Sequence, residues 1–393
     1  MTSDASGCIL HARQEVVPAT DRGDATHVRL LIGLCLVCGT AWADDGLGVG
    51  AAVGAGAQGA ASYSALELRL DAEWRGARLG LAARGVWEDG ELRRRDWSRA
   101  ADAVTVVRYL ELHGEHAALA AGALAPSQLG HVADGYRASL DDRWRTGARA
   151  ALTTEALTVG AEIDDVLSPA LVGGALAWNV SPRWGVRAAA AVDPTVPAGA
   201  MTATRTAAAI EVGGARRWDA EGRRVEVGTS IVVEPGEGLA IVGSGAAEVE
   251  RAGARWSARA DVRAGNGTGG AAFGPLHRLE RSELFDRARA GLGAGLALGV
   301  AGSRGWLTAG MRLRPGNGAL ASVTAGAPMG RWVQAGGWLA ATPRAAAGAA
   351  ELRVAWAKRM YSAFQLARMY ATDDVMDPAP TWSATAWFGI ATE

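Results

Sequence analysis

The sequence of 393 residues predicts an all-β protein, built as a single closed antiparallel barrel that crosses a membrane. Three features predict this class: a short apolar segment near the start, long runs in which apolar and polar residues alternate, and turn residues at short spacing between the runs. All three cysteines precede residue 44. The rest of the chain therefore has no thiol for a disulfide, a nucleophile or a zinc site.

The apolar segment at residues 30–43 has the length of a signal-peptide core and is shorter than the roughly 20 residues that a spanning helix needs. Ala41-Trp42-Ala43 matches the small-x-small pattern of a cleavage site, which predicts cleavage after Ala43. The Cys-x-x-Cys pair at Cys35 and Cys38 lies inside this removable segment, so we expect no redox or zinc role for it. The predicted organisation is a non-native or unstructured extension at residues 1–27, a signal peptide at 28–43 and a barrel at 44–393.

Period-two alternation dominates the chain after residue 44. In LELRLDAEWR (residues 66–75) every even position is apolar and every odd position is charged, which on a strand separates an apolar face from a polar one. The same rhythm appears in seven further runs, at residues 225–233, 255–263, 289–300, 306–314, 333–339, 351–356 and 382–390. These runs predict strands.

Turn residues separate the runs, as at residues 75–76, 179–182, 234–236, 315–318 and 327–330. About 20 candidate strands result, with lengths near the 9 to 11 residues of a tilted spanning strand, and we expect an even number of about 16–20. The three longest gaps, near residues 88–102, 126–144 and 265–287, all follow odd-numbered candidates. Long loops are therefore expected at one end and short turns at the other, with residues 214–222 as a looser turn.

Tryptophan supports the membrane assignment. Fourteen of the 15 Trp residues follow residue 43, and Trp178 and Trp184 flank one predicted turn, which is typical of an aromatic girdle. The alternative is a soluble, secreted β protein in which these rings belong to the core. We disfavour it because the opposite strand faces carry Arg and Glu in run after run.

These features together resemble the bacterial outer-membrane β-barrel, or porin-like, class over residues 44–393. The resemblance implies a location in the outer membrane of a Gram-negative bacterium. A shorter stretch, Leu129-Gly130-His131 followed by Tyr136, is similar to one in uncharacterised bacterial barrels that carry Leu-Gly-His-Gly ahead of a Tyr; here Val132 replaces the second Gly. That family implies no known activity.

Charged residues on the polar strand faces are predicted to line the lumen. There they could set a field for solute passage or form cross-strand salt bridges that pack a closed barrel, and the sequence favours neither. The predicted lining residues are Glu67, Arg69, Asp71, Glu73, Arg224, Glu226, Arg255, Arg259, Asp261, Arg263, Arg312, Glu351 and Arg353.

The loop at residues 126–144 is the candidate functional loop. It could fold into the lumen and narrow it, bind a divalent cation through its carboxylates, or remain a polar exposed loop. Its candidate residues are His131, Asp134, Tyr136, Asp141 and Asp142.

His113 and His116 flank Glu115 in a predicted short turn, where two imidazoles could approach one ion, but further ligands are not identifiable. Gly-rich runs precede neither a helix nor Gly-Lys-Ser/Thr, and Gly-x-Ser-x-Gly is absent. The sequence therefore predicts no cofactor, metal or catalytic residue.

The charge pattern bounds the partners. A formal net charge of -1 without a basic stripe argues against nucleic acid. The resemblance to outer-membrane barrels implies outer-membrane lipid as a partner and makes small hydrophilic solutes possible ones. The leading functional hypothesis is a passive porin-like channel. The alternatives are a structural or surface-binding barrel with a loop-plugged lumen and an outer-membrane hydrolase, which would need a Ser, a His and an acid in one pocket.

Overall fold

The computed structural model describes residues 47–391 apart from several gaps. Residues 1–46, which include the predicted extension and signal peptide, lie outside the described part of the chain. The gaps fall at residues 59–60, 75, 89, 94–96, 98–99, 125, 137–144, 195–207, 236–237, 266–290, 315–317, 330, 343–345, 358–359 and 371–379.

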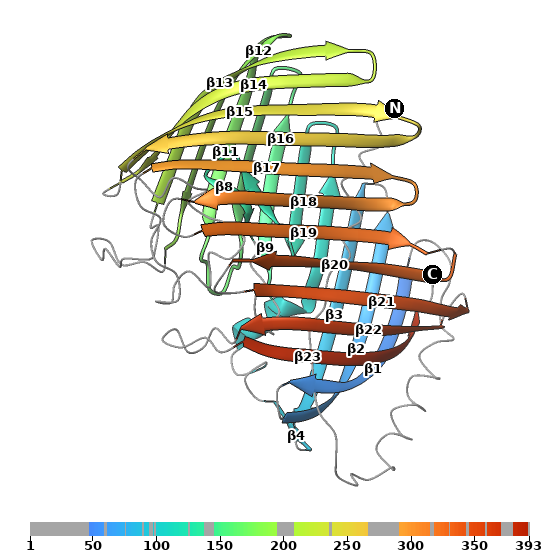
Figure 1. Cartoon of the computed structure of the whole chain (residues 1–393). Helices are drawn as coiled ribbons and strands as arrows, with labels where there is room; N and C mark the ends of the chain where they lie inside the picture. Colours follow the sequence, from blue (N-terminus) through green and yellow to red (C-terminus); the bar gives the residue numbers. More distant parts are fainter. Residues whose placement is uncertain are drawn as a thin grey trace.

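The described residues form one closed antiparallel barrel (Figure 1). The main sheet has 21 strands, of which β4 (Glu91–Leu92) is a two-residue appendage on β3 outside the ring, so the ring has 20. Each ring strand pairs with the next along the chain, and β23 (Pro380–Ala391) returns to pair with β1 (Leu47–Gln58). The predicted closed barrel with an even strand number is confirmed.

The remaining ring strands are β2 (Ala61–Trp74), β3 (Ala77–Glu88), β5 (Val107–His113), β6 (Ala117–Gly122), β9 (Gly147–Thr153), β10 (Leu157–Ile163), β11 (Val172–Ser181), β12 (Trp184–Val192), β13 (Ala208–Ala220), β14 (Arg223–Glu234), β15 (Gly238–Arg251), β16 (Ala254–Gly265), β17 (Gly291–Gly302), β18 (Gly305–Arg314), β19 (Gly318–Pro328), β20 (Val333–Ala341), β21 (Ala346–Ala357) and β22 (Met360–Tyr370). Each predicted alternating run coincides with one of these strands.

The connections differ sharply between the two ends of the barrel. At one end, which we call the turn end, only a few residues join consecutive strands. At the other, the loop end, lie all the long connections, including residues 89–106 with the 3-10 helix η2 (Ala100–Val106), 123–146, 193–207 and 266–290. Residues 214–220, expected in a looser turn, instead continue strand β13.

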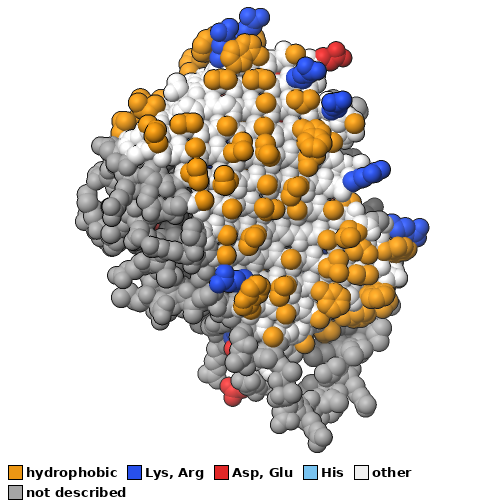
Figure 2. All heavy atoms as spheres, in the orientation of Figure 1, with side chains coloured by type: hydrophobic (Ala, Val, Ile, Leu, Met, Phe, Trp, Pro, Cys, Tyr) orange, Lys and Arg blue, Asp and Glu red, His pale blue; other side chains and the backbone are white. Residues whose placement is uncertain are grey.

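The outer face of the wall is apolar. Large aliphatic side chains alternate outward along the strands and are exposed, and Figure 2 shows hydrophobic side chains spread over the visible face. They include Leu68, Leu70, Val212, Ile231, Ile241, Val262, Leu296, Leu339 and Leu366. A soluble sandwich would bury such residues between its sheets. The soluble alternative is therefore wrong, and the barrel is of the outer-membrane type.

Exposed tryptophans gather on the outer face near the turn end. They are Trp178, Trp184, Trp218, Trp256 and Trp356. Each lies within a few residues of a short turn. Amphipathic indole rings at this level are the arrangement that a membrane–water interface favours.

Within the described residues, no helix is both long and apolar enough to cross a membrane.

The wall is shortest around β5, β6, β9 and β10, which have 7, 6, 7 and 7 residues. Strands β13 to β16 have 12 to 14. Two of the long connections, residues 89–106 and 123–146, leave the barrel from the short part. The second of them contains the hairpin β7 (Ser127–Leu129) and β8 (Ala133–Tyr136), which forms a separate two-stranded sheet.

Candidate functional site

Along each strand, side chains point alternately into the barrel and out of it. We call the positions that point into the barrel the inward phase, and the strand register places all thirteen predicted lining residues on it. Directly opposed residues of antiparallel strands point to the same face, and the inward positions can be followed from strand to strand around the ring, with register shifts in the pairs β3–β5, β11–β12 and β21–β22. For example, Arg187 lies opposite Gly213, and Glu226 lies opposite Arg217. The outward phase carries the exposed aliphatic residues instead.

Burial of this inward face changes with depth. Near the turn end the side chain of Glu73 is 72% exposed, and Arg224, Arg255 and Arg259 are also exposed. Toward the loop end Glu67, Asp261 and Arg263 are buried. The other six are intermediate: Arg69, Asp71, Glu226, Arg312, Glu351 and Arg353.

Many inward charges pair with a neighbour. Pairs that join directly opposed residues of adjacent strands include Arg149 with Glu162 at 2.7 Å, Arg217 with Glu226 at 3.1 Å and Arg255 with Glu250 at 3.2 Å. Others lie along one strand, as with Arg69 and Glu67. Cross-strand salt bridges, one of the two predicted arrangements, are thus present in the wall.

The hairpin β7–β8 packs on the inner surface of the wall. Its buried residues Leu129, Val132, Ala133 and Tyr136 form one apolar cluster with small residues of the wall. The wall side of that cluster consists of Leu171, Ala189, Ala191 and Ala209, in or next to β11, β12 and β13. Alanine at these inward positions leaves room for the hairpin, and the candidate functional loop therefore folds inward in its described part.

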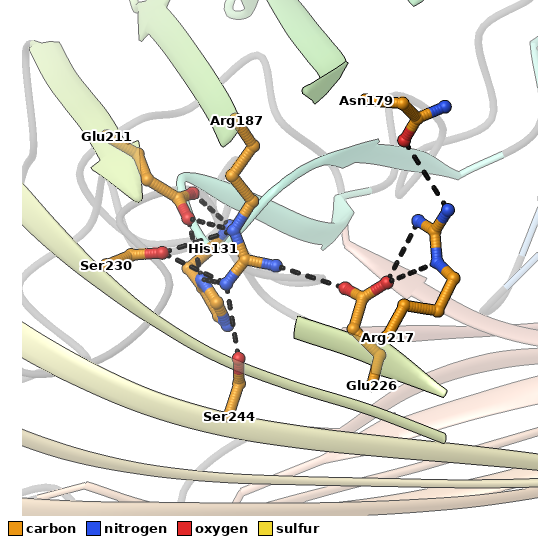
Figure 3. A network of polar contacts seen from close by, with 8 residues as sticks. All are labelled: His131, Asn179, Arg187, Glu211, Arg217, Glu226, Ser230 and Ser244. Atoms are coloured by element: carbon orange, nitrogen blue, oxygen red, sulfur yellow. Dashed lines mark hydrogen bonds and ion pairs between the residues drawn. The ribbon is translucent and has the colours of Figure 1, made fainter. Parts of the chain in front are cut away.

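His131, at the tip of the hairpin, is anchored to Glu211 of β13 (Figure 3). The backbone N–H of His131 donates to Glu211 Oε2 at 2.6 Å, and the His131 ring Nδ1 lies 2.8 Å from Oε1. Glu211 is completely buried. Gly130 has a φ of +60°, and a Cβ there would meet the Glu211 carboxylate. Only glycine fits this close approach without strain.

Arg187 of β12 completes the anchor. Its Nε lies 3.1 Å from Glu211 Oε1, and its guanidinium also donates to the hydroxyls of Ser230 and Ser244 at 3.0 and 3.2 Å. The network thus joins the hairpin to four consecutive strands, β12 to β15 (Figure 3). A buried carboxylate with several charged and polar partners is strongly favoured over one left alone.

Ser230 and Ser244 share this network with His131, which is the proximity that the hydrolase alternative requires. Both hydroxyls bond to Arg187 rather than to the imidazole. Within the described residues the network therefore contains no Ser–His hydrogen bond through which His131 would activate a nucleophile.

A second anchor holds the far end of the hairpin. The Tyr136 hydroxyl donates to the Asp164 carboxylate, whose other oxygen accepts the backbone N–H groups of Ala170 and Leu171 at 2.9 and 3.0 Å. Tyr136 is 1% exposed. For His131 and Tyr136 the expectation of a polar exposed loop is therefore wrong.

The other three predicted loop residues contribute less. Asp134 is described only by its backbone, which pairs with Gln128, and Asp141 and Asp142 lie outside the described residues. The cation-binding role predicted for the loop stays a prediction. Across the described ranges, no three His, Cys, Asp or Glu side chains are grouped so as to hold a metal ion.

His113 and His116 lie on the exposed β5–β6 turn. Their ring Nε2 atoms approach different acidic residues, Glu111 at 3.8 Å and Glu115 at 3.9 Å. The structure thus gives them separate partners.

A second inward cluster lies where the barrel closes, around the pairing of β23 with β1. It is built from aromatic rings and arginines. Tyr63, Tyr361 and Trp387 are buried together. The Arg353 guanidinium lies 4.0 Å from the Tyr361 ring centroid, and that of Arg84 lies 5.0 Å from the Trp387 ring centroid. These contacts are in cation–π range.

Glu211, Arg187 and this aromatic cluster were not predicted from the sequence. Glu211 and Arg187 each stand as the sole charge in a stretch of small and apolar residues, AAIEVGG and WGVRAAAAV. A lone charge on the inward phase of such a strand was the available signal, because it must find a buried partner. For the aromatic cluster no local sequence pattern was available. Tyr361 and Trp387 meet residues of β2 and β3 only because the two ends of the sheet pair with each other.

No protein-family model matches the chain, and no curated protein matches it. Solved structures that the chain matches include two proteins of Pseudomonas aeruginosa. OccK5 (OpdH) has 8% identity over 89% of this chain and 98% of that one, at a TM-score of 0.35. OccK2 (OpdF), in complex with glucuronate, has 10% identity over 88% of this chain and 97% of that one, at a TM-score of 0.36. A BenF-like porin from Pseudomonas fluorescens Pf-5 has 8% identity over 88% and 98% at 0.34. The fold assignment itself rests on the closed strand pairing.

Proposed function

We propose that the chain is a passive outer-membrane channel for small hydrophilic solutes, narrowed on one side by the hairpin β7–β8. Barrels of roughly 16 to 18 strands already leave an aqueous channel, and this ring has 20. A wall of this size, with charged residues along its inward face, supports a water-filled lumen.

The observation that carries the proposal is the alternation along β7. Ser127 and Leu129 are buried, whereas Gln128 between them is exposed. Strand β7 thus has one side, at Ser127 and Leu129, that is buried and another, at the polar Gln128, that is open. Such an element is suited to narrowing a passage that it borders, because a fully packed plug would bury both of its sides.

The exposed inward charges at the turn end are of both signs. Glu73 and Glu250 are exposed, as are Arg224 and Arg255. Selectivity depends on the net field of the lining residues. We therefore propose weak selectivity between small cations and anions, which a reversal potential measured in a salt gradient checks.

Planar-bilayer recordings test the channel itself. Protein purified from outer membranes should give conductance steps, and liposomes that contain it should swell in small sugars. Preparations that give neither steps nor swelling would contradict the proposal.

A loop-plugged structural or surface-binding barrel is the second candidate, favoured by the anchors at His131 and Tyr136. It predicts a silent wild type in which deletion of residues 126–144 opens a conductance. A wild type that already conducts excludes it.

Export is part of the proposal. We propose a signal peptide at residues 28–43 cleaved after Ala43, preceded by a non-native or unstructured extension at residues 1–27. N-terminal sequencing of the outer-membrane protein should begin at Asp44, and any other start contradicts this cleavage site.

A further inference from the structure

Arg216 and Arg217 are neighbours in β13 but have opposite surroundings. Arg217 faces inward, where its guanidinium donates to Glu226 at 3.1 Å and to Asn179 at 3.4 Å. Arg216 faces outward with the apolar phase and is exposed. It has no carboxylate bonded to it among the described residues.

Two tryptophans flank the Arg216 side chain on the outer face. Trp184 lies directly opposite it on β12, and Trp218 is two residues further along β13. The guanidinium carbon lies 5.5 Å from the Trp184 ring centroid and 5.0 Å from that of Trp218. Both rings are about half exposed. Cation–π contacts with two indoles hold the guanidinium in place, and its N–H donors remain accessible because Arg216 is exposed.

The depth of this cluster restricts what can bind there. Trp184 begins β12 directly after a short turn, and Arg216 and Trp218 lie close to the end of β13. An outward arginine is unfavourable at the bilayer midplane by roughly 2 to 4 kcal/mol and nearly neutral at the interface. The cluster therefore lies at the level of lipid headgroups, and Figure 2 shows further Arg side chains along the edge that carries the short turns.

We infer that Trp184, Arg216 and Trp218 form a binding site for the phosphate of a phospholipid at the turn end of the barrel. The guanidinium binds the phosphate through its paired N–H donors. The indole rings pack against the adjoining glycerol and upper acyl chains, because each ring is apolar with one polar edge. This site is separate from the lumen and does not depend on conduction.

Native mass spectrometry of the protein from outer membranes, titrated with phosphatidylglycerol in detergent, tests the site. Arg216→Gln is expected to weaken the tightest lipid-binding step about fivefold, the effect of one basic residue near an anionic lipid surface. Arg217→Gln is the matched control, because it removes the adjacent charge from the inner face, and it should bind lipid as the wild type does. Diacylglycerol with the same acyl chains should not distinguish Arg216→Gln from the wild type.

Equal phosphatidylglycerol binding by Arg216→Gln and the wild type would overturn the inference, as would an equal loss in Arg217→Gln. Displacement of the lipid by inorganic phosphate alone would also overturn it, because it would indicate a site for free anion. Should Arg216→Gln fail to assemble, the double variant Trp184→Leu with Trp218→Leu keeps the charge and removes both rings. Weaker lipid binding by that variant supports the site, and unchanged binding rejects it.

Discussion

Arg255 and Arg263 lie on the same strand, face the same way and each pair with a carboxylate, yet their surroundings are opposite. Near the turn end, Arg255 and Glu250 are 3.2 Å apart, with side chains 51% and 65% exposed. Near the loop end, Arg263 and Asp261 are 2.6 Å apart, with side chains 1% and 6% exposed. Glu73 and Glu67 on β2 repeat the contrast.

The comparison separates two determinants of a barrel interior. The period of two along a strand decides which face a side chain occupies. Burial of that face changes with depth along the strand, and the hairpin β7–β8 with its anchors lies on the buried, loop-end half. Ion pairs of similar appearance should therefore contribute very differently to stability.

Removing Glu211 should have the largest effect, because it leaves the buried His131 and the partly buried Arg187 without their shared carboxylate. We expect Glu211→Ala to destabilise the hairpin by about 3–5 kcal/mol, measured as faster hydrogen exchange of the amides in β7 and β8. Glu250→Ala, inward on β15 but exposed, should leave that exchange unchanged. Equal protection in both variants would mean that Glu211 is not the anchor.

The two ion pairs of β16 test the comparison directly. Arg263→Met leaves Asp261 buried, although Arg312 lies 3.9 Å away, and should lower the free energy of unfolding by about 3 kcal/mol. Arg255→Met should change it by less than about 1 kcal/mol. Urea unfolding in lipid vesicles measures both, and equal losses would remove the distinction between the two halves.

Gly130 tests the fit of the hairpin tip. Gly130→Ala places a Cβ against the Glu211 carboxylate at positive φ, so we expect a loss of about 1–2 kcal/mol. Gly243→Ala is the control, since its Cβ meets no atom within 4 Å and should raise the unfolding free energy by about 0.5 kcal/mol. The same sign at both positions would contradict this account of the tip.

The smallest expected effect comes from a substitution in a short turn at the turn end. Ala252 has a φ of +55° and precedes Gly253 at +72°, the backbone of a type I′ hairpin turn, which prefers Asn-Gly. Ala252→Asn should therefore stabilise the barrel by about 0.5–1 kcal/mol in the same urea assay. Ser303→Asn, in a turn whose Ser has no positive φ, should give no gain.

The sequence was sufficient for the barrel but only partly for its interior. Alternation and turn residues are local, so they identified strands such as residues 255–263 and the end at which the long loops emerge. The anchor joins His131 to Glu211, 80 residues away, and the sequence supplied only the loop half of that pair. The burial of Arg263 could not be predicted either, because Arg263 and Arg255 occupy equivalent positions in the same alternating run.

The most direct test of a passage bordered by the hairpin is chemical modification of Gln128, the exposed residue of β7. Since the chain after residue 44 contains no cysteine, Gln128→Cys provides a unique thiol in the barrel. Single-channel conductance should fall when a bulky cationic methanethiosulfonate reacts with this variant, while the wild type stays unchanged. An unaltered conductance step after complete modification would contradict the account, because solutes would then pass elsewhere than beside the hairpin.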